Sequence, residues 1–289
     1  MPSQSDPTVI TPGLLRDWAM PVPEGGKSAR GTVLVVGGSR FVPGAVLLAG
    51  LAALRAGAGV LQLASAESSA AALSIEVPEA LVVGLPETGD GAVAGDIGDR
   101  LTDLAGAADA IAIGPGLTDI EQTRALLRRT LAVAGDRTAL VLDAYALGAL
   151  SHEPELLADR KLPAVLTPNM TEAEHLLGHE PGDDVAAAAV ELADRYGCVV
   201  ALRSHVAAPD GRIWRDESGD TGLATSGSGD VLAGILAGLL SRGAEPAQAA
   251  CWAAYAHAAS GQRLVPRFGR LGFLARELLD EVPRVLAQI

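Results

Sequence analysis

The sequence contains little of what marks a secreted, nucleic-acid-binding or membrane protein. Its two cysteines, Cys198 and Cys251, lie in apolar stretches, which excludes a disulfide framework and a cysteine-based metal cluster. We expect both thiols to be buried and unreactive. Positive charge is also scarce, and the formal net charge of −13 argues against binding to nucleic acid or to an anionic membrane through bulk electrostatics.

Long hydrophobic runs and targeting signals are missing as well. No apolar run reaches the length of a membrane span without a glycine or a charge. Residues 1–12 lack the basic stretch and following apolar stretch of a signal peptide, so we expect a cytoplasmic protein. Aromatic residues make up 3% of a chain that is 49% hydrophobic. The core must therefore consist mainly of Ala, Val and Leu, which favours a layered α/β protein.

Short β-branched segments alternate along the chain with longer Ala/Leu segments at helical spacing. Strands are expected at residues 32–36, 80–83, 110–113, 140–142, 164–166 and 198–202, and helices at 45–56, 121–134, 171–177, 185–196, 231–241 and 246–262. The strand segments lack polar alternation, which is typical of strands buried on both faces of a parallel sheet. This order predicts a doubly wound, mostly parallel sheet with helices on both sides. We expect a single domain at residues 12–289 after a flexible N-terminus at residues 1–11.

Glycines gather in the loops after the predicted strands. Gly37 and Gly38 follow the strand at 32–36, and residues 114–116 read Gly-Pro-Gly after the strand at 110–113. Each segment can be a tight turn, or it can let a ligand approach the backbone closely. Ligands of doubly wound sheets bind beyond the carboxyl ends of the strands. These loops are therefore expected to line one common crevice.

Two polar residues occupy equivalent places further along the chain. Asp143 follows the strand at 140–142 and can either help to hold Mg²⁺ through water or cap the next turn. Asn169 lies just before a predicted helix, where Thr171 and Glu174 have the spacing of a capping box. Both side chains should face the crevice that the glycine loops line.

The most informative stretch is TSGSGD at residues 225–230, which leads directly into an apolar helical segment. Gly227 and Gly229 leave no side chain between the peptide N–H groups and a ligand. The helix that begins near Asp230 points its free N–H groups and its positive dipole end at the same place, so an anion would be stabilised there. Asp230 can be the helix N-cap, or a general base that takes a proton from a hydroxyl beside a phosphate.

Other familiar catalytic arrangements are absent from the sequence. It has no serine nucleophile elbow, no HExxH motif and no paired cysteines, so a serine triad and zinc hydrolysis are poorly supported. His257 lies in an alanine-rich segment, where a packed or surface role is more common than a ligand role. No set of metal ligands is therefore predicted from the chain itself.

Several of these segments together resemble a known family. TSGSGDVLAGILAGLL, followed by AAYAHAASG, is similar to the C-terminal signature of the ADP/ATP-dependent NAD(P)H-hydrate dehydratases, which belong to the ribokinase-like superfamily. The resemblance extends through GGSRFVPGAVLLAGLAALRAGAG, IGPGL, LVLDAYAL and LTPNMTEAEHLLG in the same order. It covers nearly all of residues 31–260, which makes it far more specific than any one motif.

The resemblance implies a fold, an activity and a set of site residues. It implies a ribokinase-like three-layer fold and an ADP-dependent (S)-NAD(P)H-hydrate dehydratase that uses ADP or ATP with Mg²⁺ to restore hydrated NADH or NADPH. It also implies a homo-oligomer, often a tetramer. By position, the substrate-binding residues would be Ala45, Gly116, Asn169 and Asp230, with Asp230 as the catalytic base. The nucleotide-binding residues would be Arg203, Ser204, His205, Val206, Ala207, Gly227, Ser228 and Gly229.

The chain departs from the family pattern at several of these positions. Asn169 stands where the family has a histidine, and an amide cannot carry a proton charge near neutral pH. Arg203 keeps the positive charge of a family lysine, but Ser204 replaces a glycine and Ala207 removes a hydroxyl. Tyr145 replaces an aspartate, and Ser226 replaces a further glycine. These changes indicate altered substrate or nucleotide use, or lost catalysis.

Three hypotheses follow from these observations. The first is a dehydratase with a nucleotide as phosphoryl donor. The second is a small-molecule kinase of the same superfamily that keeps Asp230 as base and accepts another alcohol. The third is a non-catalytic nucleotide-binding homologue, which ligands would stabilise without turnover.

Overall fold

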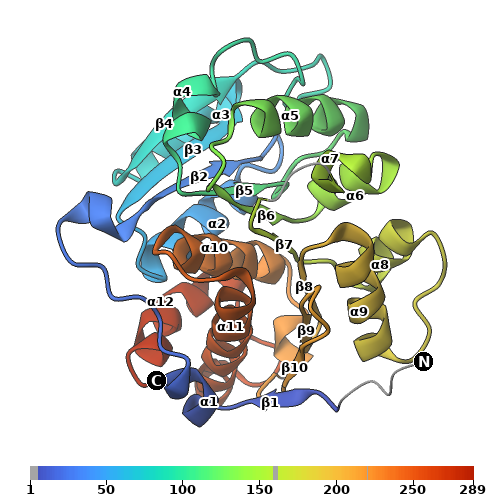
Figure 1. The fold of residues 1–289 in the computed structure, drawn as a ribbon. Helices are drawn as coiled ribbons and strands as arrows, with labels where there is room; N and C mark the ends of the chain where they lie inside the picture. The colour runs from blue at the N-terminus through green and yellow to red at the C-terminus, as the bar shows by residue number, and fades with distance from the viewer. Residues whose placement is uncertain (1–5, 159–161, 220) are drawn as a thin grey trace.

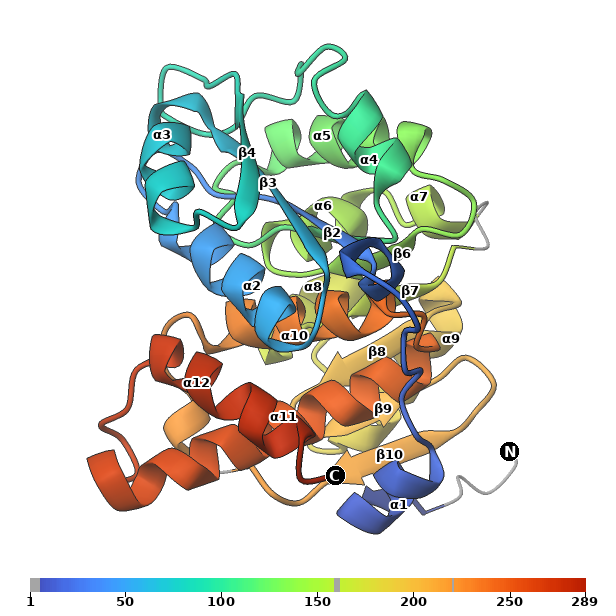
Figure 2. The same ribbon diagram turned by 90° about the vertical axis from the view of Figure 1, so that its left-hand side faces the viewer.

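One sheet runs through the molecule between two layers of helices (Figures 1 and 2). The computed structural model describes residues 6–158, 162–219 and 221–289. Within these ranges the sheet has ten strands in the order β1-β10-β9-β8-β7-β6-β5-β2-β3-β4. Strand β9 pairs antiparallel with both of its neighbours, and the other pairs are parallel. The predicted doubly wound, mostly parallel three-layer α/β fold is confirmed.

The secondary structure agrees with the alternating segments of the sequence. The strands are β1 (Thr8–Ile10), β2 (Thr32–Val36), β3 (Val60–Ala66), β4 (Ala80–Leu85), β5 (Ala110–Ile113), β6 (Ala139–Leu142), β7 (Ala164–Leu166), β8 (Val199–Leu202), β9 (His205–Ala207) and β10 (Ile213–Asp216). The α-helices are α1 (Pro12–Asp17), α2 (Gly44–Arg55), α3 (Glu67–Glu76), α4 (Thr102–Ala107), α5 (Ile120–Val133), α6 (Tyr145–His152), α7 (Glu155–Ala158), α8 (Met170–Leu177), α9 (Val185–Tyr196), α10 (Ser228–Ser241), α11 (Pro246–Phe268) and α12 (Ala275–Leu286). Two 3-10 helices, η1 (Lys27–Arg30) and η2 (Thr221–Leu223), precede β2 and α10.

The structure corrects the expectation of a flexible N-terminus at residues 1–11. Residues 1–5 lie outside the described part of the chain, but Thr8–Ile10 form β1, which pairs in parallel with β10 from Thr8 opposite Trp214 to Ile10 opposite Asp216. Thr11 then caps α1 through its side chain, which accepts a hydrogen bond from the Leu14 N–H. Strand β1 was not predicted, because a strand of three residues is too short to show a periodic pattern in the sequence.

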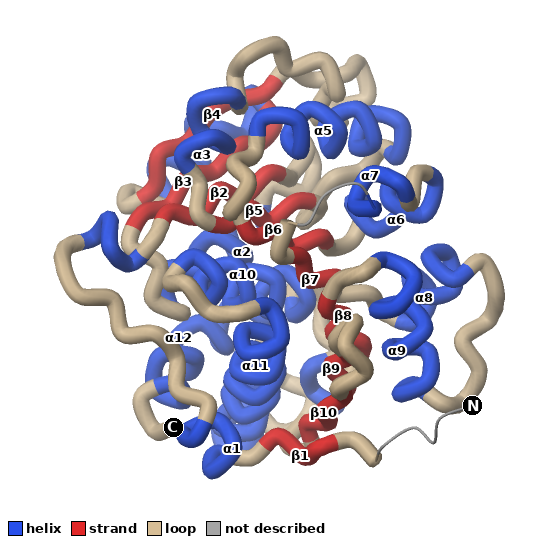
Figure 3. The backbone as a smooth tube through the Cα atoms, viewed as in Figure 1, coloured by secondary structure: helices blue, strands red, loops and turns tan. Residues whose placement is uncertain are grey.

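The two faces of the sheet bury different side chains. Val33 and Val35 of β2 and the alanines at positions 110 and 112 of β5 face the layer of α2, α10, α11 and α12. The alternate residues of the same strands, such as Leu34 and Ile111, pack with residues of α4, α5, α6, α8 and α9. Figure 3 shows the sheet between the two sets of helices. Small side chains on the first face leave room for helices to lie close to the sheet and to each other.

Helices α2 and α10 make the closest of these approaches. A Cβ atom on Gly234 would lie 2.1 Å from the carbonyl oxygen of Ala49, and one on Gly238 would lie 2.5 Å from that of Ala53. The contacts advance in the same direction along both helices, so the helices run side by side and begin at the same edge of the sheet (Figure 2). Because α2 follows β2, this is the edge at which the parallel strands end.

Candidate functional site

The glycine loops after β2 and β5 lie against each other at this edge. The Gly38 N–H donates a hydrogen bond of 2.7 Å to the carbonyl oxygen of Pro115. Gly116 has a φ of 72°, and a Cβ atom there would lie 2.6 Å from the Val42 carbonyl oxygen and 2.9 Å from the Ala45 side chain. Two of the predicted substrate-binding residues, Ala45 and Gly116, are therefore direct neighbours, and no larger residue fits at Gly116.

The TSGSGD segment forms the start of α10 beside these loops. Gly227 is the N-cap, with a φ of 85°, and a Cβ atom there would lie 2.6 Å from the Leu48 side chain of α2. Asp230 is the third residue of the helix, so the interpretation of Asp230 as N-cap was wrong. The N-cap makes no side-chain hydrogen bond, because glycine has no side chain to offer the first N–H groups.

The backbone N–H groups of this turn are available to a ligand. The N–H groups of Ser228 and Val231 donate to the carbonyl oxygens of Thr225 and Gly227, both at 3.2 Å. The N–H groups of Gly229 and Asp230 donate to no group of the described residues. No atom outside the local chain lies within 4 Å of a Cβ position on Gly229, so space remains beside these donors. The geometry therefore suits a bound anion.

We call the turn that carries the free N–H groups of Gly229 and Asp230 the cradle. The Asp230 carboxylate lies at its edge. It makes no hydrogen bond or ion pair with a side chain of the described residues. Partial burial raises the pKa of Asp230 from its ordinary 3.8 to about 6. An unpaired carboxylate with a raised pKa, next to anion-binding N–H groups, is suited to take a proton from a hydroxyl.

The side chain of Ser228, one of the predicted nucleotide-binding residues, contacts a buried histidine. Its hydroxyl oxygen lies 2.9 Å from Nε2 of His257 on α11, and both residues are buried. Only the backbone of Ser228 is therefore left to contribute to the cradle. Burial lowers the pKa of His257 to about 4, so the imidazole is neutral near pH 7.

Asp143, at the end of β6, is a second buried acid near Asp230. Its Oδ1 accepts a hydrogen bond of 2.7 Å from the Thr167 hydroxyl. Burial raises the pKa of Asp143 to about 7, and the nearby negative charge of Asp230 adds to that increase. It does not cap the next turn, because the N-cap of α6 is Ala144 without a side-chain hydrogen bond. The capping interpretation of Asp143 was therefore wrong.

Asn169 begins α8 after β7, as the sequence predicts, but with a different partner. Its Oδ1 accepts from the Glu172 N–H at 3.0 Å, and a Glu172 carboxylate oxygen accepts from the Asn169 N–H at 2.9 Å. The capping box therefore joins Asn169 and Glu172, and the predicted box of Thr171 and Glu174 was wrong. The Oδ1 of Asn169 is committed to the helix, which leaves its amide N–H groups for a ligand.

The segment at residues 203–207 consists of a tight hairpin turn and strand β9. Leu202 pairs with His205 across a two-residue turn, in which Arg203 has a φ of 53°. Val206 and Ala207 are 1% and 0% exposed, so their side chains cannot contact a ligand. Arg203 is exposed and Ser204 is partly exposed, and both follow β8 at the edge that carries Asn169. The accessible part of the five predicted nucleotide-binding residues is therefore residues 203–205.

The candidate site contains groups of the kind that bind phosphate. The N–H groups of Gly229 and Asp230 are free donors among the described residues, and Arg203 is an exposed positive charge in the turn after β8. Among the described residues no three His, Cys, Asp or Glu side chains are grouped to hold a metal ion. Mg²⁺ is usually held by substrate phosphates with one or two carboxylates, and the buried acid Asp143 fits that need.

Comparison with known proteins identifies the family. A model of the NAD(P)H-hydrate dehydratase family matches residues 33–284. The chain belongs to the NAD(P)H-hydrate dehydratase family. The ADP-dependent (S)-NAD(P)H-hydrate dehydratase of Xanthomonas campestris pv. campestris is 46% identical over 97% of this chain and 96% of that protein. Other curated relatives are bifunctional NAD(P)H-hydrate repair enzymes, and the chain spans about half of their length.

Solved structures of NAD(P)H-hydrate dehydratases and their superfamily have the same fold. The Bacillus subtilis ADP/ATP-dependent NAD(P)H-hydrate dehydratase, co-crystallised with ATP and Mg²⁺, aligns with a TM-score of 0.80 and 30% identity over 98% of this chain and 99% of that one. A ribokinase-like superfamily protein from Enterococcus faecalis aligns with a TM-score of 0.83 and 24% identity over 97% and 95% of the two chains. The expected family and ribokinase-like fold are confirmed.

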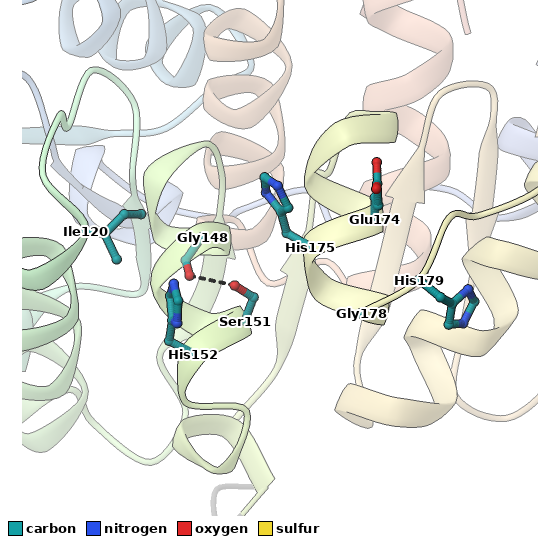
Figure 4. A pocket seen from close by; sticks show the side chains of 8 residues that line it. All are labelled: Ile120, Gly148, Ser151, His152, Glu174, His175, Gly178 and His179. Atoms are coloured by element: carbon teal, nitrogen blue, oxygen red, sulfur yellow. Dashed lines mark hydrogen bonds between the residues drawn. The ribbon is translucent and has the colours of Figure 1, made fainter.

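A separate pocket lies on the outer face of the helices. It has a volume of about 570 Å³ between the later turns of α6 and α8, and Figure 4 shows the residues that line it. They include His152, His175 and His179. The pocket contains none of the predicted substrate- or nucleotide-binding residues. Of these three histidines, His179 forms a hydrogen bond through Nε2 with the Glu191 carboxylate.

Two residues of the crevice had no sequence signal. The Thr167 hydroxyl donates a hydrogen bond to Asp143, and His257 forms a hydrogen bond with the Ser228 hydroxyl. A threonine before a proline and a single histidine in an alanine-rich helix are both common without a functional role. Only the proximity that folding creates reveals these contacts.

Proposed function

We propose that the chain is an ADP-dependent (S)-NAD(P)H-hydrate dehydratase, which restores NAD(P)H from its hydrated form. The observation that carries the proposal is the unpaired Asp230 carboxylate, with a pKa raised to about 6, beside the free N–H groups of the α10 turn. That arrangement joins a base for a hydroxyl with a cradle for a phosphoryl group. The names of the relatives supply the substrate and the nucleotide.

The reaction balances with these groups. Asp230 takes the proton of the ring hydroxyl, whose oxygen forms a bond to the terminal phosphorus of ADP while the bond from that phosphorus to AMP breaks. The phosphate ester then leaves as inorganic phosphate, a ring proton is lost to solvent or a base, and the ring double bond returns. Bound Mg²⁺ would neutralise phosphate charge during transfer. Water alone is a poor leaving group, so the transfer makes its loss feasible.

We also propose roles for individual residues, which rest on the resemblance to the family and on their places after the parallel strands. Ala45, Gly116 and the Asn169 amide would contact the hydrated dinucleotide. Arg203 and Ser204 would approach the nucleotide from the hairpin turn, together with His205, which is half-buried and whose pKa burial lowers. Gly227, Ser228 and Gly229 would bind its phosphates through the backbone.

The direct test is the return of NADH absorbance when hydrated NADH is mixed with the protein, Mg²⁺ and either ADP or ATP. We expect restoration with ADP and release of AMP and phosphate in equal amounts. No restoration with either nucleotide would contradict the proposal. The same assay with hydrated NADPH determines which dinucleotide is preferred.

A second candidate rests on Asn169. The family histidine is replaced here by an amide whose oxygen caps α8, so the substrate side of the crevice differs from the family pattern. A ribokinase-like kinase acting on another alcohol would form ADP from ATP with a panel of alcohols, without restoring NADH. Ligand-induced stabilisation with no turnover on any substrate would instead indicate the non-catalytic alternative.

We further propose a homo-oligomer in the cytoplasm, with a tetramer as the form to test. The support is the resemblance to the dehydratase family. None of the helices in the described residues is long and apolar enough to cross a membrane. Light scattering of the purified protein measures the assembly, and a monomeric mass would contradict the proposal.

A further inference from the structure

A buried imidazole lies beneath the first turn of α10. Nε2 of His257 is 2.9 Å from Oγ of Ser228, and the two residues are 9% and 4% exposed. The contact joins α11 to α10 across 29 residues of sequence. None of the roles proposed above uses His257, although it touches the residue between the two glycines of the cradle.

The turn that His257 contacts has few other restraints. Gly227 and Gly229 flank Ser228, and glycine is the residue with the greatest backbone freedom. The helix N-cap provides no side-chain hydrogen bond, and the Ser228 and Val231 N–H groups make backbone bonds of 3.2 Å. The Ser228 hydroxyl is therefore the side-chain anchor of this turn to the protein core.

The hydrogen bond between His257 and Ser228 adds no charge beneath the proposed anion site. Burial keeps His257 neutral at neutral pH, since the pKa of the imidazole is lowered to about 4. A neutral imidazole can form a hydrogen bond with a hydroxyl without placing a further charge beneath the phosphates. The hydrogen bond joins two buried side chains and holds both partners in one geometry.

We propose that His257 is a positioning residue, whose hydrogen bond to Ser228 fixes the N–H groups of Gly229 and Asp230 and the Asp230 carboxylate for nucleotide and substrate. The inference rests on the proposed function of the cradle. His257 touches neither ligand and acts through Ser228. Loss of the bond lets the glycine-flanked turn move, and small displacements of reacting groups have large effects on rate.

The hydrogen bond between His257 and Ser228 can be tested by replacing His257 with two amide side chains of different length. In His257→Gln the amide reaches the place of Nε2, whereas in His257→Asn it reaches the place of Nδ1, away from Ser228. We expect His257→Asn to raise the KM for ADP and lower kcat, together roughly ten- to hundredfold in kcat/KM. His257→Gln should stay within about threefold of the parent. Equal kinetics for the two variants would overturn the inference.

A double-mutant cycle shows whether His257 acts through Ser228. Ser228→Ala should reproduce the kinetic change of His257→Asn, and the double variant should be no worse than either single one. Tyr196→Phe is the matched control, because it removes another buried hydrogen bond, from the Tyr196 hydroxyl to the Leu176 carbonyl oxygen, far from the crevice. It should lower the melting temperature without changing KM. Additive losses in the double variant would contradict the proposal.

Calorimetric titration with ADP and Mg²⁺ separates this inference from the proposed function. If the parent binds ADP but does not restore NADH, the proposed reaction is wrong, yet the anchor still predicts weaker ADP binding by His257→Asn than by His257→Gln. If the parent is active and the two variants bind ADP equally, the anchor is wrong and the proposed function stands.

Discussion

The two walls of the crevice are built by different means. The α2–α10 wall, made of Ala45, Gly116 and residues 227–230, presents backbone N–H groups and one carboxylate on helices that pack through glycine. The α8–hairpin wall, made of Asn169 and residues 203–205, presents side chains at the ends of β7 and β8. The departures from the family pattern lie mainly on the second wall. A wall made of backbone can change little without changing the packing beneath it, whereas side chains at strand ends can vary on an unaltered fold.

The largest effect on catalysis is expected from removal of the Asp230 carboxylate, which belongs to the α2–α10 wall. Asp230→Asn keeps the shape but cannot accept a proton, so kcat should fall roughly 10²- to 10⁴-fold. In the parent, kcat/KM should rise with pH through about 6, because the raised pKa of Asp230 keeps its base form scarce below that value. Steady-state kinetics across pH measure both effects. An active variant, or a parent rate that does not change with pH around 6, would remove Asp230 from catalysis.

The second-largest effect is expected on stability, from substitutions at the contact between α2 and α10 beneath that wall. Gly234→Ala places a methyl group 2.1 Å from the Ala49 carbonyl oxygen, so α2 and α10 must separate. We expect a loss of about 1–3 kcal/mol of unfolding free energy and weaker nucleotide binding. Gly106→Ala in α4 is the control, because the nearest atom to its Cβ position is 3.9 Å away. It should be neutral or slightly stabilising in denaturant unfolding, and an equal loss in both variants would rule out close packing as the cause.

A smaller, purely local effect is expected on the α8–hairpin wall. Asn169→Ala removes the N-cap of α8 and should cost about 1 kcal/mol of stability. It should also raise the KM for the hydrated dinucleotide several-fold, because the amide donors are lost. Asp184→Ala removes the N-cap of α9, whose Oδ1 accepts from the Ala187 N–H at 3.0 Å. The Asp184 charge acts on His205 of the hairpin, but Asp184 is not among the residues proposed to contact the hydrated dinucleotide. Both variants should lose similar stability, and only Asn169→Ala should change KM. Unchanged KM in Asn169→Ala would mean that Asn169 is only a cap.

The smallest effect is expected at the hairpin turn. Arg203 is exposed, so its attraction to phosphates is screened by solvent and salt. Arg203→Ala should weaken ADP binding a few-fold, and the difference from the parent should shrink as salt is added. Arg203→Lys keeps the charge and should bind nearly as well as the parent. If the alanine variant binds ADP like the parent at low salt, the hairpin does not contact the nucleotide.

Central buried strands were predictable because their signal is local. Residues 32–36 and 110–113 were expected as strands and form β2 and β5. Strand β3 was missed because Gln62 and Ser65 interrupt its apolar run, and the Gln62 side-chain oxygen is buried without a hydrogen-bond partner in the described structure. Strand β9 was missed because its pairing depends on a turn in which Arg203, a non-glycine residue, adopts a positive φ.

The candidate site was predictable in its location but only partly in its geometry. Glycine-rich loops after parallel strands were expected to lie together at one edge of the sheet, and the structure brings the loops after β2 and β5 together there. The spacing of TSGSGD could not show that the helix begins at Ser228, which makes Asp230 an internal residue of the first turn. The sequence analysis predicted a capping box at Thr171 and Glu174, whereas the N-cap of the helix lies two residues earlier and its capping box joins Asn169 and Glu172. Contacts between distant segments, such as Ser228 with His257, carry no local signal.

The glycine contacts of α2 and α10 have an electrostatic consequence. Two parallel helices in such close contact bring their positive N-terminal ends side by side, and like partial charges repel each other. The packing that forms the cradle therefore also makes the empty cradle unfavourable. A phosphate group placed between the two helix ends turns that repulsion into attraction. The protein without nucleotide should be the less stable form, and a bound nucleotide would act as a structural part of the α2–α10 pair as well as a reactant.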